Sequence, residues 1–368
     1  MKNHSSENKK IIIVAGGSGG HVFPAIAVID ELIDSSFDIL MITDKRGLNY
    51  KNLFPNITIR VVESDTPFGK NKLKKIIFSF KIIQGLFQSF SILLNFSPRL
   101  IIGFGGYPSF PPIMIAYLLR IPIIIHEQNI IMGRANRFLR NLARKILISH
   151  KDTKNLLPKH SNKTLLVGNP IRKEICRYRS AKPPLHNHTN NFNILIFGGS
   201  QGASIFSDLI PRSLSLLEIE LRSNINIVQQ AIKEDLFFLE KKYSELSVNA
   251  KIETFFDNLP LHINEADIII SRAGATSIDE FRVIGKPSIL IPLSHSIDND
   301  QYANAKKLEN DGACILVEEK DLNENFLSNK ITYFYKNRDV LTKMSLAAHT
   351  TGNTSAAKNI ADLILTYY

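Results

Sequence analysis

The chain has 368 residues, of which 44% are hydrophobic and 21% charged, and this composition excludes a disordered protein and a membrane-embedded bundle. One hydrophobic core rarely organises so many residues, so the length predicts two domains. Two cysteines, Cys176 and Cys314, are too few and too far apart in the sequence for a disulfide framework or a zinc site, which fits a reducing compartment. Residues 1–10 are polar and hold no apolar segment, so we expect no signal peptide.

The positive charge is concentrated in the first half of the chain. Residues 1–169 contain 23 lysines and arginines against 10 aspartates and glutamates, whereas residues 170–368 contain 22 against 24. The net charge of +11 therefore comes from a first half at +13 and a second half at −2. A basic half-molecule predicts an anionic partner there, such as nucleic acid, anionic lipid or a phosphorylated substrate.

Short apolar runs alternate with amphipathic stretches from one end of the chain to the other. The runs are continuous and rich in isoleucine, which is typical of parallel strands that are covered by helices on both faces. We therefore predict an α/β doubly wound architecture. The ten predicted strands are Ile11–Ala15, Phe37–Thr43, Leu100–Phe104, Ile121–Ile125, Lys145–Ser149, Ile194–Phe197, Ile225–Gln229, Ile268–Ser271, Ser288–Pro292 and Cys314–Val317.

The two halves of the chain begin alike. Residues 11–21 read IIIVAGGSGGH and residues 194–203 read ILIFGGSQGA, so each half starts with a strand that runs into a glycine-rich turn and a helix. This repeat predicts two Rossmann-like domains that face each other across a cleft. A proline-containing stretch without periodicity separates them. We place a first domain at 9–169 and a second at 170–352, with a C-terminal helix at 353–368 that can pack back on the first.

The segment Lys70–Phe96 begins with a lysine cluster and continues as a long apolar stretch. Its polar residues recur at spacings of three and four, so they form one narrow stripe on a helix whose other face is apolar. These residues are Lys81, Gln84, Gln88, Ser91 and Asn95. Three interpretations remain open. The first is a transmembrane span of about 20 residues, and the polar stripe argues against it. The second is a helix buried among its neighbours. The third is a helix on an anionic membrane surface, anchored by the lysines.

The motif Gly16–His21, GGSGGH, follows the first strand and precedes a helix. Glycines here let backbone N–H groups approach an anion, and a helix N-terminus favours negative charge. A dinucleotide fingerprint would have a third glycine where Val22 stands, although Asp44 lies near a second strand end, where such a site has its acid. His21 is a candidate general base or phosphate ligand, because ligands bind at strand-end crevices.

Two further motifs follow strands of the first half. Gly103–Pro108, GFGGYP, has two interpretations. In one, its glycines let an anionic group of the substrate approach the backbone, and in the other the segment is only a tight turn. His126–Asn129, HEQN, places four polar residues at the carboxyl end of a buried strand, where they point into the crevice. Asn129 is a candidate for binding a sugar hydroxyl or amide, and Glu127 is a second candidate base.

In the second half, Ser271–Glu280, SRAGATSIDE, marks the end of a strand and the start of a helix near Ser277. Ala275, Thr276 and Ser277 would offer N–H groups and hydroxyls to a diphosphate. Glu280 would accept hydrogen bonds from both ribose hydroxyls, or would be a surface acid that the helix dipole favours.

Two more segments of the second half carry polar chemistry. Gly198–Ala203, GGSQGA, is its opening glycine-rich turn. Asp298–Gln301, DNDQ, places two carboxylates two residues apart. That pair could hold Mg²⁺ or Mn²⁺, and N-capping of the following helix is an equally good interpretation.

Seven motifs follow the order of one known family and span the chain from about Lys10 to Leu365. They are GGSGGH, GFGGYPS, HEQN, GNPIR, GGSQGA, SRAGATSIDE and DNDQYANA. The sequence resembles the MurG family, transferases that add N-acetylglucosamine to undecaprenyl-diphosphate-N-acetylmuramoyl-pentapeptide. The resemblance implies the two-domain glycosyltransferase-B fold, with UDP-N-acetylglucosamine held by the second domain. It also implies a role in peptidoglycan synthesis, cell wall biogenesis, cell shape and cell division.

The resemblance implies roles for individual residues as well. Donor-contacting positions fall on Ser18, Gly19, Gly20, Asn129, Arg172, Ser200 and Gln301. Phe256 matches a position whose backbone contacts the uracil, Glu280 matches the ribose-binding acid, and His21 matches a histidine proposed to act on the acceptor–diphosphate side. Ser18 stands where the family usually has threonine, and Thr276 stands where leucine is common.

The implied reaction is a single displacement that inverts the anomeric centre and forms a β1→4 bond to the acceptor's C4 hydroxyl. His21 is the first candidate base and Glu127 the second. Helix N-terminal N–H groups near Ala275–Ser277 and Ser200 would stabilise the leaving diphosphate, so we expect neither a cofactor nor a metal to be required. Lys70–Phe96 matches the family's membrane-association patch, so we expect a peripheral protein on the cytoplasmic face of the bacterial inner membrane, with no nucleic-acid partner.

Competing interpretations belong to other classes. They are a UDP-N-acetylglucosamine 2-epimerase or diacylglycerol glucosyltransferase of the same fold, a nicotinamide-dependent dehydrogenase, and a non-catalytic membrane-surface or nucleic-acid-binding protein. The HEQN and GGSQGA pair argues against the first group, and Val22 argues against the dehydrogenase. A protein with only a basic surface does not need two matched glycine-rich crevices. Binding of UDP rather than NAD or a polynucleotide would separate these classes.

Overall fold

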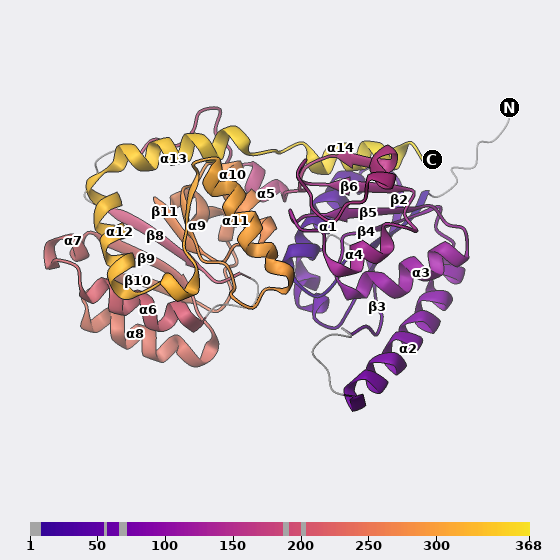
Figure 1. Cartoon of the computed structure of the whole chain (residues 1–368), viewed down its shortest axis with the longest axis horizontal. Helices are drawn as coiled ribbons and strands as arrows, with labels where there is room; N and C mark the ends of the chain where they lie inside the picture. The colour runs from indigo at the N-terminus through magenta and orange to yellow at the C-terminus, as the bar shows by residue number, and fades with distance from the viewer. Residues whose placement is uncertain (1–8, 55–56, 66–71, 187–190, 200–203) are drawn as a thin grey trace. The chain divides into compact units, whose positions relative to one another are not determined.

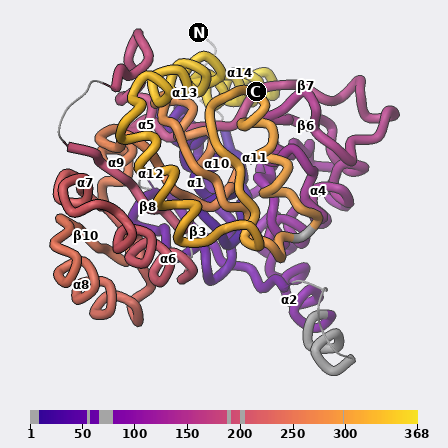
Figure 2. The backbone as a smooth tube through the Cα atoms, turned by 60° about the vertical axis from the view of Figure 1, so that its left-hand side comes forward, coloured from indigo at the N-terminus to yellow at the C-terminus, as the bar shows by residue number. Residues whose placement is uncertain are grey.

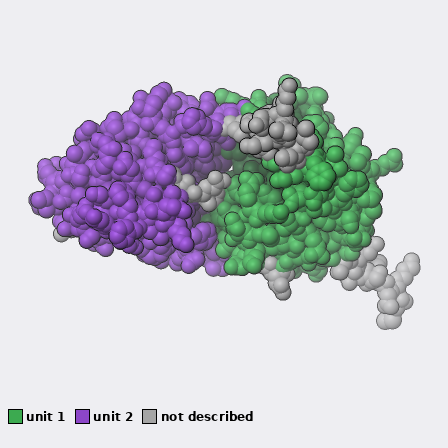
Figure 3. All heavy atoms as spheres, turned by 90° about the horizontal axis from the view of Figure 1, so that it is seen from below, with its two compact units in different colours: residues 1–173, 354–368 green, residues 174–353 purple. Residues whose placement is uncertain are grey.

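The computed structural model describes residues 9–54, 57–65, 72–186, 191–199 and 204–368 of the chain. The chain forms two compact α/β units, residues 1–173 with 354–368 and residues 174–353 (Figure 3). The sequence placed the change of domain after residue 169, and the structure places it after Lys173, within the short helix α5 (Lys173–Cys176).

The first unit is built on a seven-stranded sheet in which all neighbouring strands are parallel. Its strands are β1 (Lys9–Val14), β2 (Phe37–Thr43), β3 (Thr58–Val61), β4 (Leu100–Gly103), β5 (Ile123–Glu127), β6 (Lys145–Ile148) and β7 (Thr164–Leu166). They are ordered β3-β2-β1-β4-β5-β6-β7. Figure 1 labels β2, β3, β4, β5 and β6 of this sheet. The direction of the order reverses between β1 and β4, so the carboxyl ends of these strands flank a topological switch point, where α/β proteins bind ligands.

Helices cover both faces of this sheet, as continuous apolar strands require. They are α1 (Gly19–Leu32), α2 (Lys72–Phe96), α3 (Phe110–Leu118), α4 (Arg134–Leu139) and the C-terminal α14 (Ala356–Leu365). On one face, α14 packs against α1, and Ile360 joins the core that contains Ile11 and Ile13 of β1. On the other face, α2, α3 and α4 enclose Ile12 and Val14. Successive residues of β1 point to opposite faces, so one strand serves both cores.

The second unit repeats this plan with a six-stranded parallel sheet. Its strands are β8 (Phe192–Phe197), β9 (Ile225–Gln230), β10 (Asn249–Glu253), β11 (Ile268–Ser271), β12 (Ser288–Leu290) and β13 (Cys314–Leu316). The order β10-β9-β8-β11-β12-β13 puts its switch point between β8 and β11. Its helices are α6 (Ser204–Ser215), α7 (Ile219–Ser223), α8 (Leu236–Glu245), α9 (Leu259–Glu265), α10 (Ala275–Ile284), α11 (Asp300–Asn310), α12 (Glu324–Lys336) and α13 (Arg338–Thr351). The predicted fold class, two parallel α/β domains of the Rossmann type, is confirmed.

All ten predicted apolar runs form strands, and the structure adds three strands that the runs did not indicate. These are β3, β7 and β10, and each lies at the edge of its sheet. Their residues are half-buried or exposed. An edge strand has one neighbour and less covered surface, so it does not need a continuous apolar run.

The long helix α2 lies at the outside of the first unit (Figure 2) and exposes large apolar side chains along one side. We call these residues the exposed apolar stripe: Phe80, Ile83, Phe87, Phe90 and Leu94. Among the side chains of α2 that the structure describes, the buried positions are Gly85, Ser89 and Leu93. A Cβ on Gly85 would lie 2.2 Å from the carbonyl oxygen of Glu63, so the glycine permits this close approach. The interpretation of α2 as a buried helix is therefore wrong, and no helix in the described ranges is long and apolar enough to cross a bilayer.

Candidate functional site

The GGSGGH motif forms the turn between β1 and α1. Gly17 has a φ of +53°, a left-handed conformation that favours glycine, and Ser18 is the N-cap residue of α1. Gly19 and Gly20 are the first helical residues, so their N–H groups lie outside the hydrogen-bond ladder of the helix. The turn and the helix start therefore lie at the switch point of the first sheet.

Arg46 lies against this turn, and the sequence did not single it out. A Cβ on Gly17 would lie 2.4 Å from Nη2 of Arg46, so the guanidinium covers the glycine directly. The Asp44 carboxylate holds it there, because it accepts from Arg46 Nε at 2.9 Å and from the Gly47 N–H at 3.0 Å. In a dinucleotide site, an acid at the position of Asp44 would bind the ribose hydroxyls. Because the Asp44 carboxylate binds Arg46 instead, the structure adds a second argument against the dehydrogenase interpretation.

The glycines of GFGGYP lie against the imidazole of His21. Gly105 and Gly106 have left-handed φ values of +92° and +78°, and a Cβ on either would come within 3.2 Å of a ring atom of His21. Pro108 of the same motif packs on Gly16, where an added Cβ would lie 2.4 Å from the proline ring. The glycines therefore make room for a side chain of the first motif, which neither sequence interpretation anticipated.

HEQN brings a third loop to the same histidine. Gln128 is 1% exposed, and its Oε1 lies 3.3 Å from Nδ1 of His21. Its amide nitrogen donates to the Phe104 carbonyl at 2.8 Å and lies 3.2 Å from Nδ1 of His126. Sequence analysis assigned roles to the neighbours of Gln128 and not to Gln128, because a linear polar run does not show which side chain turns towards a distant histidine.

The Glu127 carboxylate is 1% exposed and accepts hydrogen bonds from its own loop. Oε1 accepts from the N–H and the side-chain amide of Asn129, at 3.0 and 3.2 Å. Oε2 accepts from the Gly133 N–H and the Asn136 amide, each at 2.9 Å. These four donors occupy the acceptor positions of the buried carboxylate. The geometry therefore favours His21 over Glu127 as the base, and it gives Glu127 the task of fixing Asn129 and the loop beyond it.

In the second unit, α10 begins at Ala275, earlier than the sequence indicated, with Gly274 as its N-cap residue. Ala275, Thr276 and Ser277 therefore supply the first three N–H groups of the helix, where the dipole favours an anion. Glu280 follows Thr276 by one turn on the same face and is only 2% exposed. The interpretation of Glu280 as a surface acid is therefore wrong.

Gln301 joins the loops after two strands of the second sheet. Its Oε1 accepts from the N–H of Ala273, after β11, at 3.3 Å and from the N–H of Leu293, after β12, at 3.0 Å. Asp300 starts α11, its carboxylate accepts from the Gln301 N–H at 2.9 Å, and burial raises its pKa. Across the described part of the chain, no group of three or more His, Cys, Asp or Glu side chains is placed to hold a metal ion.

The remaining predicted residues lie in separate places. Arg172, which the sequence assigned to the second domain, belongs to the first unit, and its guanidinium lies 4.1 Å from the centroid of the Phe23 ring. Phe256 is buried in the second unit, with its ring centroid 5.3 Å from that of His262. Ser200 lies outside the described residues.

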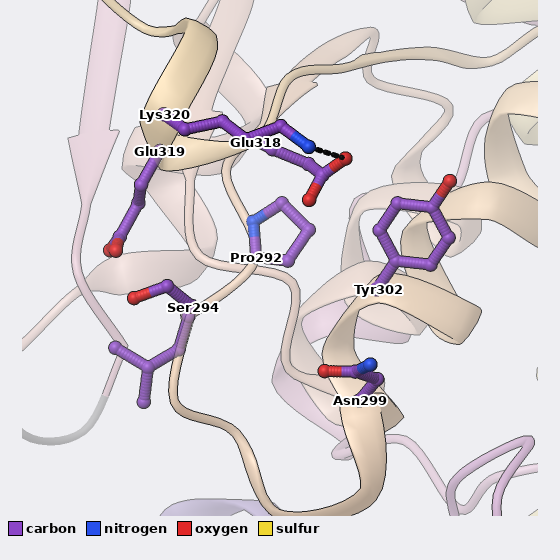
Figure 4. A pocket seen from close by; sticks show the side chains of 8 residues that line it. Pro292, Ser294, Asn299, Tyr302, Glu318, Glu319 and Lys320 are labelled. Carbon is purple, nitrogen blue, oxygen red and sulfur yellow. Dashed lines mark ion pairs between the residues drawn. The ribbon is translucent and has the colours of Figure 1, made fainter.

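A pocket of about 230 Å³ opens in the second unit next to the Gln301 loop (Figure 4). It is lined by the loops after β12 and β13 and by the start of α11, which contribute Ser294, Glu318 and Tyr302. The Lys320 ammonium lies 3.2 Å from the Glu318 carboxylate, so these charges offset each other. Paired charges, hydroxyls and an aromatic ring suit a neutral polar molecule better than an anion.

The two units carry different chemistry at their switch points. In the first, the loops after β1, β4 and β5 converge on His21. In the second, the N-terminus of α10 follows β11 and has the buried Glu280 one turn inside it. A candidate base in one Rossmann-type unit and a helix start that favours an anion in the other fit a two-domain glycosyltransferase that uses a nucleotide sugar.

Comparison with known proteins specifies the family. The model of the glycosyltransferase family 28 N-terminal domain matches residues 11–148, and the model of the family 28 C-terminal domain matches residues 193–364. A crystal structure of MurG from Acinetobacter baumannii has a TM-score of 0.74 and 26% sequence identity, and the match covers 98% of this chain and 99% of that one.

Two relatives carry the name UDP-N-acetylglucosamine–N-acetylmuramyl-(pentapeptide) pyrophosphoryl-undecaprenol N-acetylglucosamine transferase. The protein from Rickettsia bellii is 39% identical over 92% of this chain and 94% of its own length. The protein from Bartonella henselae is 37% identical over 97% of this chain and 94% of its own length. This chain therefore belongs to glycosyltransferase family 28 and, within it, to the MurG family of N-acetylglucosamine transferases.

Proposed function

We propose that this enzyme transfers N-acetylglucosamine from UDP-N-acetylglucosamine to the C4 hydroxyl of undecaprenyl-diphosphate-N-acetylmuramoyl-pentapeptide, which converts lipid I to lipid II. The observation that carries the proposal is the convergence of three loops on one imidazole. Gly105 and Gly106 pack on the His21 ring, and Gln128 contacts its Nδ1. The names of the relatives supply the donor and acceptor classes.

In this mechanism His21 takes the proton of the acceptor hydroxyl as the hydroxyl oxygen attacks the anomeric carbon of the donor sugar. The bond from that carbon to the UDP oxygen breaks on the opposite side, so the anomeric centre is inverted and a β1→4 bond forms. The proton stays on His21 until solvent removes it, and UDP leaves with the bonding electron pair.

The second unit supplies the groups that suit the donor. Negative charge develops on the diphosphate as the sugar departs, and the first N–H groups of α10, from Ala275 to Ser277, are already oriented for an anion. Glu280 is the acid for the ribose hydroxyls, and Gln301 and the Phe256 backbone complete the donor contacts. The proposal requires no metal, because fixed backbone dipoles can stabilise the diphosphate.

The exposed apolar stripe of α2 supports a membrane-surface role. Phe80 is 68% exposed and Phe87 is 72% exposed, and the stripe recurs at helical spacing along one side of α2. The sequence adds a lysine cluster at the start of this helix and a net charge of +13 over residues 1–169. Apolar side chains next to basic ones bind anionic bilayers by insertion and attraction together. We therefore place the enzyme peripherally on the cytoplasmic face of the bacterial inner membrane.

Vesicles of phosphatidylglycerol test this surface. The double variant Phe80→Ser/Phe87→Ser should bind them on the order of 100-fold more weakly, or more weakly still, since two buried Phe side chains contribute about 3–6 kcal/mol together. Gln84→Ser, an exposed polar change on the same helix, should leave binding unchanged. Equal binding of the double variant and the wild type would remove α2 from the proposal.

The transfer assay tests the activity itself. Labelled N-acetylglucosamine in its UDP form is mixed with the lipid-linked muramoyl-pentapeptide, and labelled lipid is measured. His21→Ala should lower kcat by about 10²–10⁴-fold with UDP binding intact. Glu280→Ala should raise the donor KM, whereas the exposed Glu240→Ala on α8 should not. UDP binding without lipid labelling by the wild type would move the function to another enzyme of this fold.

A further inference from the structure

A chain of buried hydrogen bonds runs from a backbone carbonyl to His21. Nε2 of His126 lies 2.9 Å from the Gly168 carbonyl oxygen, which can only accept, so Nε2 carries the proton. Nδ1 of His126 then holds a lone pair and accepts from the Gln128 amide nitrogen at 3.2 Å. The same amide nitrogen donates to the Phe104 carbonyl at 2.8 Å.

These two bonds fix the orientation of the Gln128 side chain. Turning the amide over would set its oxygen 2.8 Å from the Phe104 carbonyl oxygen and opposite the lone pair of His126, with acceptors facing acceptors. His126 is fully buried and Gln128 is 1% exposed, so solvent would not relieve that conflict. Oε1 of Gln128 must therefore face His21.

Because Oε1 can only accept, Nδ1 of His21 is the donor across their 3.3 Å contact. We propose that Gln128 is the positioning residue of the transfer reaction: it holds His21 as the Nδ1–H tautomer and so directs the lone pair of Nε2 to the acceptor hydroxyl. The inference rests on the proposed function of His21 as the base. The amide fixes the tautomer without adding a charge beside the imidazole.

The glycines of the second loop leave room for the ring in the orientation that this bond needs. An added Cβ at Gly105 would lie 3.2 Å from Cε1 and Nδ1 of His21, and one at Gly106 would lie 3.2 Å from Cδ2. The imidazole therefore packs against two consecutive backbone positions of this loop. Turning the ring over would put Cδ2 opposite Oε1 of Gln128 and lose the hydrogen bond.

The test reads the tautomer directly. The enzyme is labelled with ¹⁵N-histidine, and the His21 signals are assigned by their loss in His21→Ala. At alkaline pH, where imidazoles are neutral, wild-type His21 should show a protonated Nδ1 and an unprotonated Nε2. In Gln128→Met, which has similar length and no amide, the Nδ1–H preference should be lost. The transfer kcat should then fall on the order of 100-fold or more, with UDP affinity and donor KM unchanged.

Asn141→Leu is the matched control, because Oδ1 of Asn141 lies 3.2 Å from Nε2 of His160 in another amide–histidine pair of the first unit. It should leave the His21 signals and the transfer rate unchanged. An Nε2–H tautomer in the wild type would overturn the inference, and so would an unchanged kcat in Gln128→Met. If the wild type shows no transfer to the lipid-linked acceptor, the proposed function fails while the tautomer result stands by itself.

Discussion

Replacing Glu127 by glutamine separates a structural role of this carboxylate from a role as the base. The buried carboxylate accepts from Asn129 through one oxygen and from Gly133 and Asn136 through the other. Glutamine preserves the shape but turns one oxygen into an amino group. If the amide oxygen keeps the two bonds from Asn129, the amino group points at two other donors.

The cost follows from those contacts. The Gly133 N–H and the Asn136 amide each lose an acceptor at 2.9 Å and face a donor instead. A buried donor left unsatisfied costs about 1–3 kcal/mol. The Asn136 amide also donates to the His126 carbonyl at 3.0 Å, so it keeps one partner. We therefore expect Glu127→Gln to lower the free energy of unfolding of the first unit by about 2–4 kcal/mol.

Hydrogen exchange at peptide resolution is the assay, because it reports the first unit separately from the second. Peptides of the first unit should exchange faster in Glu127→Gln, and peptides of the second unit should not change. Glu240→Gln, at an exposed site on α8, should change stability by less than about 0.5 kcal/mol. Unchanged protection in Glu127→Gln together with a large loss of transfer rate would refute the reasoning and make Glu127 the base.

Three further predictions concern other parts of the chain. Burial lowers the pKa of Lys286 from 10.5 to about 8, so between these values the unfolded chain binds a proton that the folded chain does not, and stability rises with pH. This shift corresponds to about 3 kcal/mol at pH 7, and losing the hydrogen bond from Lys286 Nζ to the Ala266 carbonyl costs about 1 kcal/mol. Lys286→Met should therefore raise the free energy of unfolding by about 2 kcal/mol at pH 7 in urea unfolding, and this gain should disappear as the pH rises to the unfolded pKa. Gly105→Ala and Gly312→Ala each place alanine at a left-handed φ, which lowers stability by about 1 kcal/mol. Only Gly105→Ala crowds His21, so only that variant should lower the kcat of transfer. EDTA should leave the transfer rate unchanged, and a strict loss would assign a metal to the carboxylates of Asp298 and Asp300 at the start of α11.

The sequence alone predicted the two parallel sheets, because fully covered strands need unbroken apolar runs and such runs are visible in one dimension. It did not indicate β3, β7 and β10, since edge strands carry no such requirement. The motifs were also visible in the sequence, because glycine at a left-handed φ and polar residues at strand ends are local demands. Their order along the chain was enough to indicate the family.

Tertiary structure decided which face of α2 is covered. Helical periodicity showed one wide apolar face and one narrow polar stripe, and burial of the apolar face was an open interpretation. The structure instead buries small residues such as Gly85 and Ser89 and exposes Phe80 and Phe87. The choice depends on how closely the helix must approach the backbone at Glu63, which is a distance between segments that periodicity does not contain.

Tertiary structure also decided how the site residues work together. The sequence named His21 as the first candidate base and Glu127 as the second. Only the fold places Gln128 and two glycines around His21, and only the fold surrounds the Glu127 carboxylate with donors. A residue type states which bonds a side chain can form. Which partners lie within hydrogen-bonding distance of that side chain depends on how loops far apart in the chain pack together. This packing is what distinguishes His21, the candidate base, from Glu127, the structural acid.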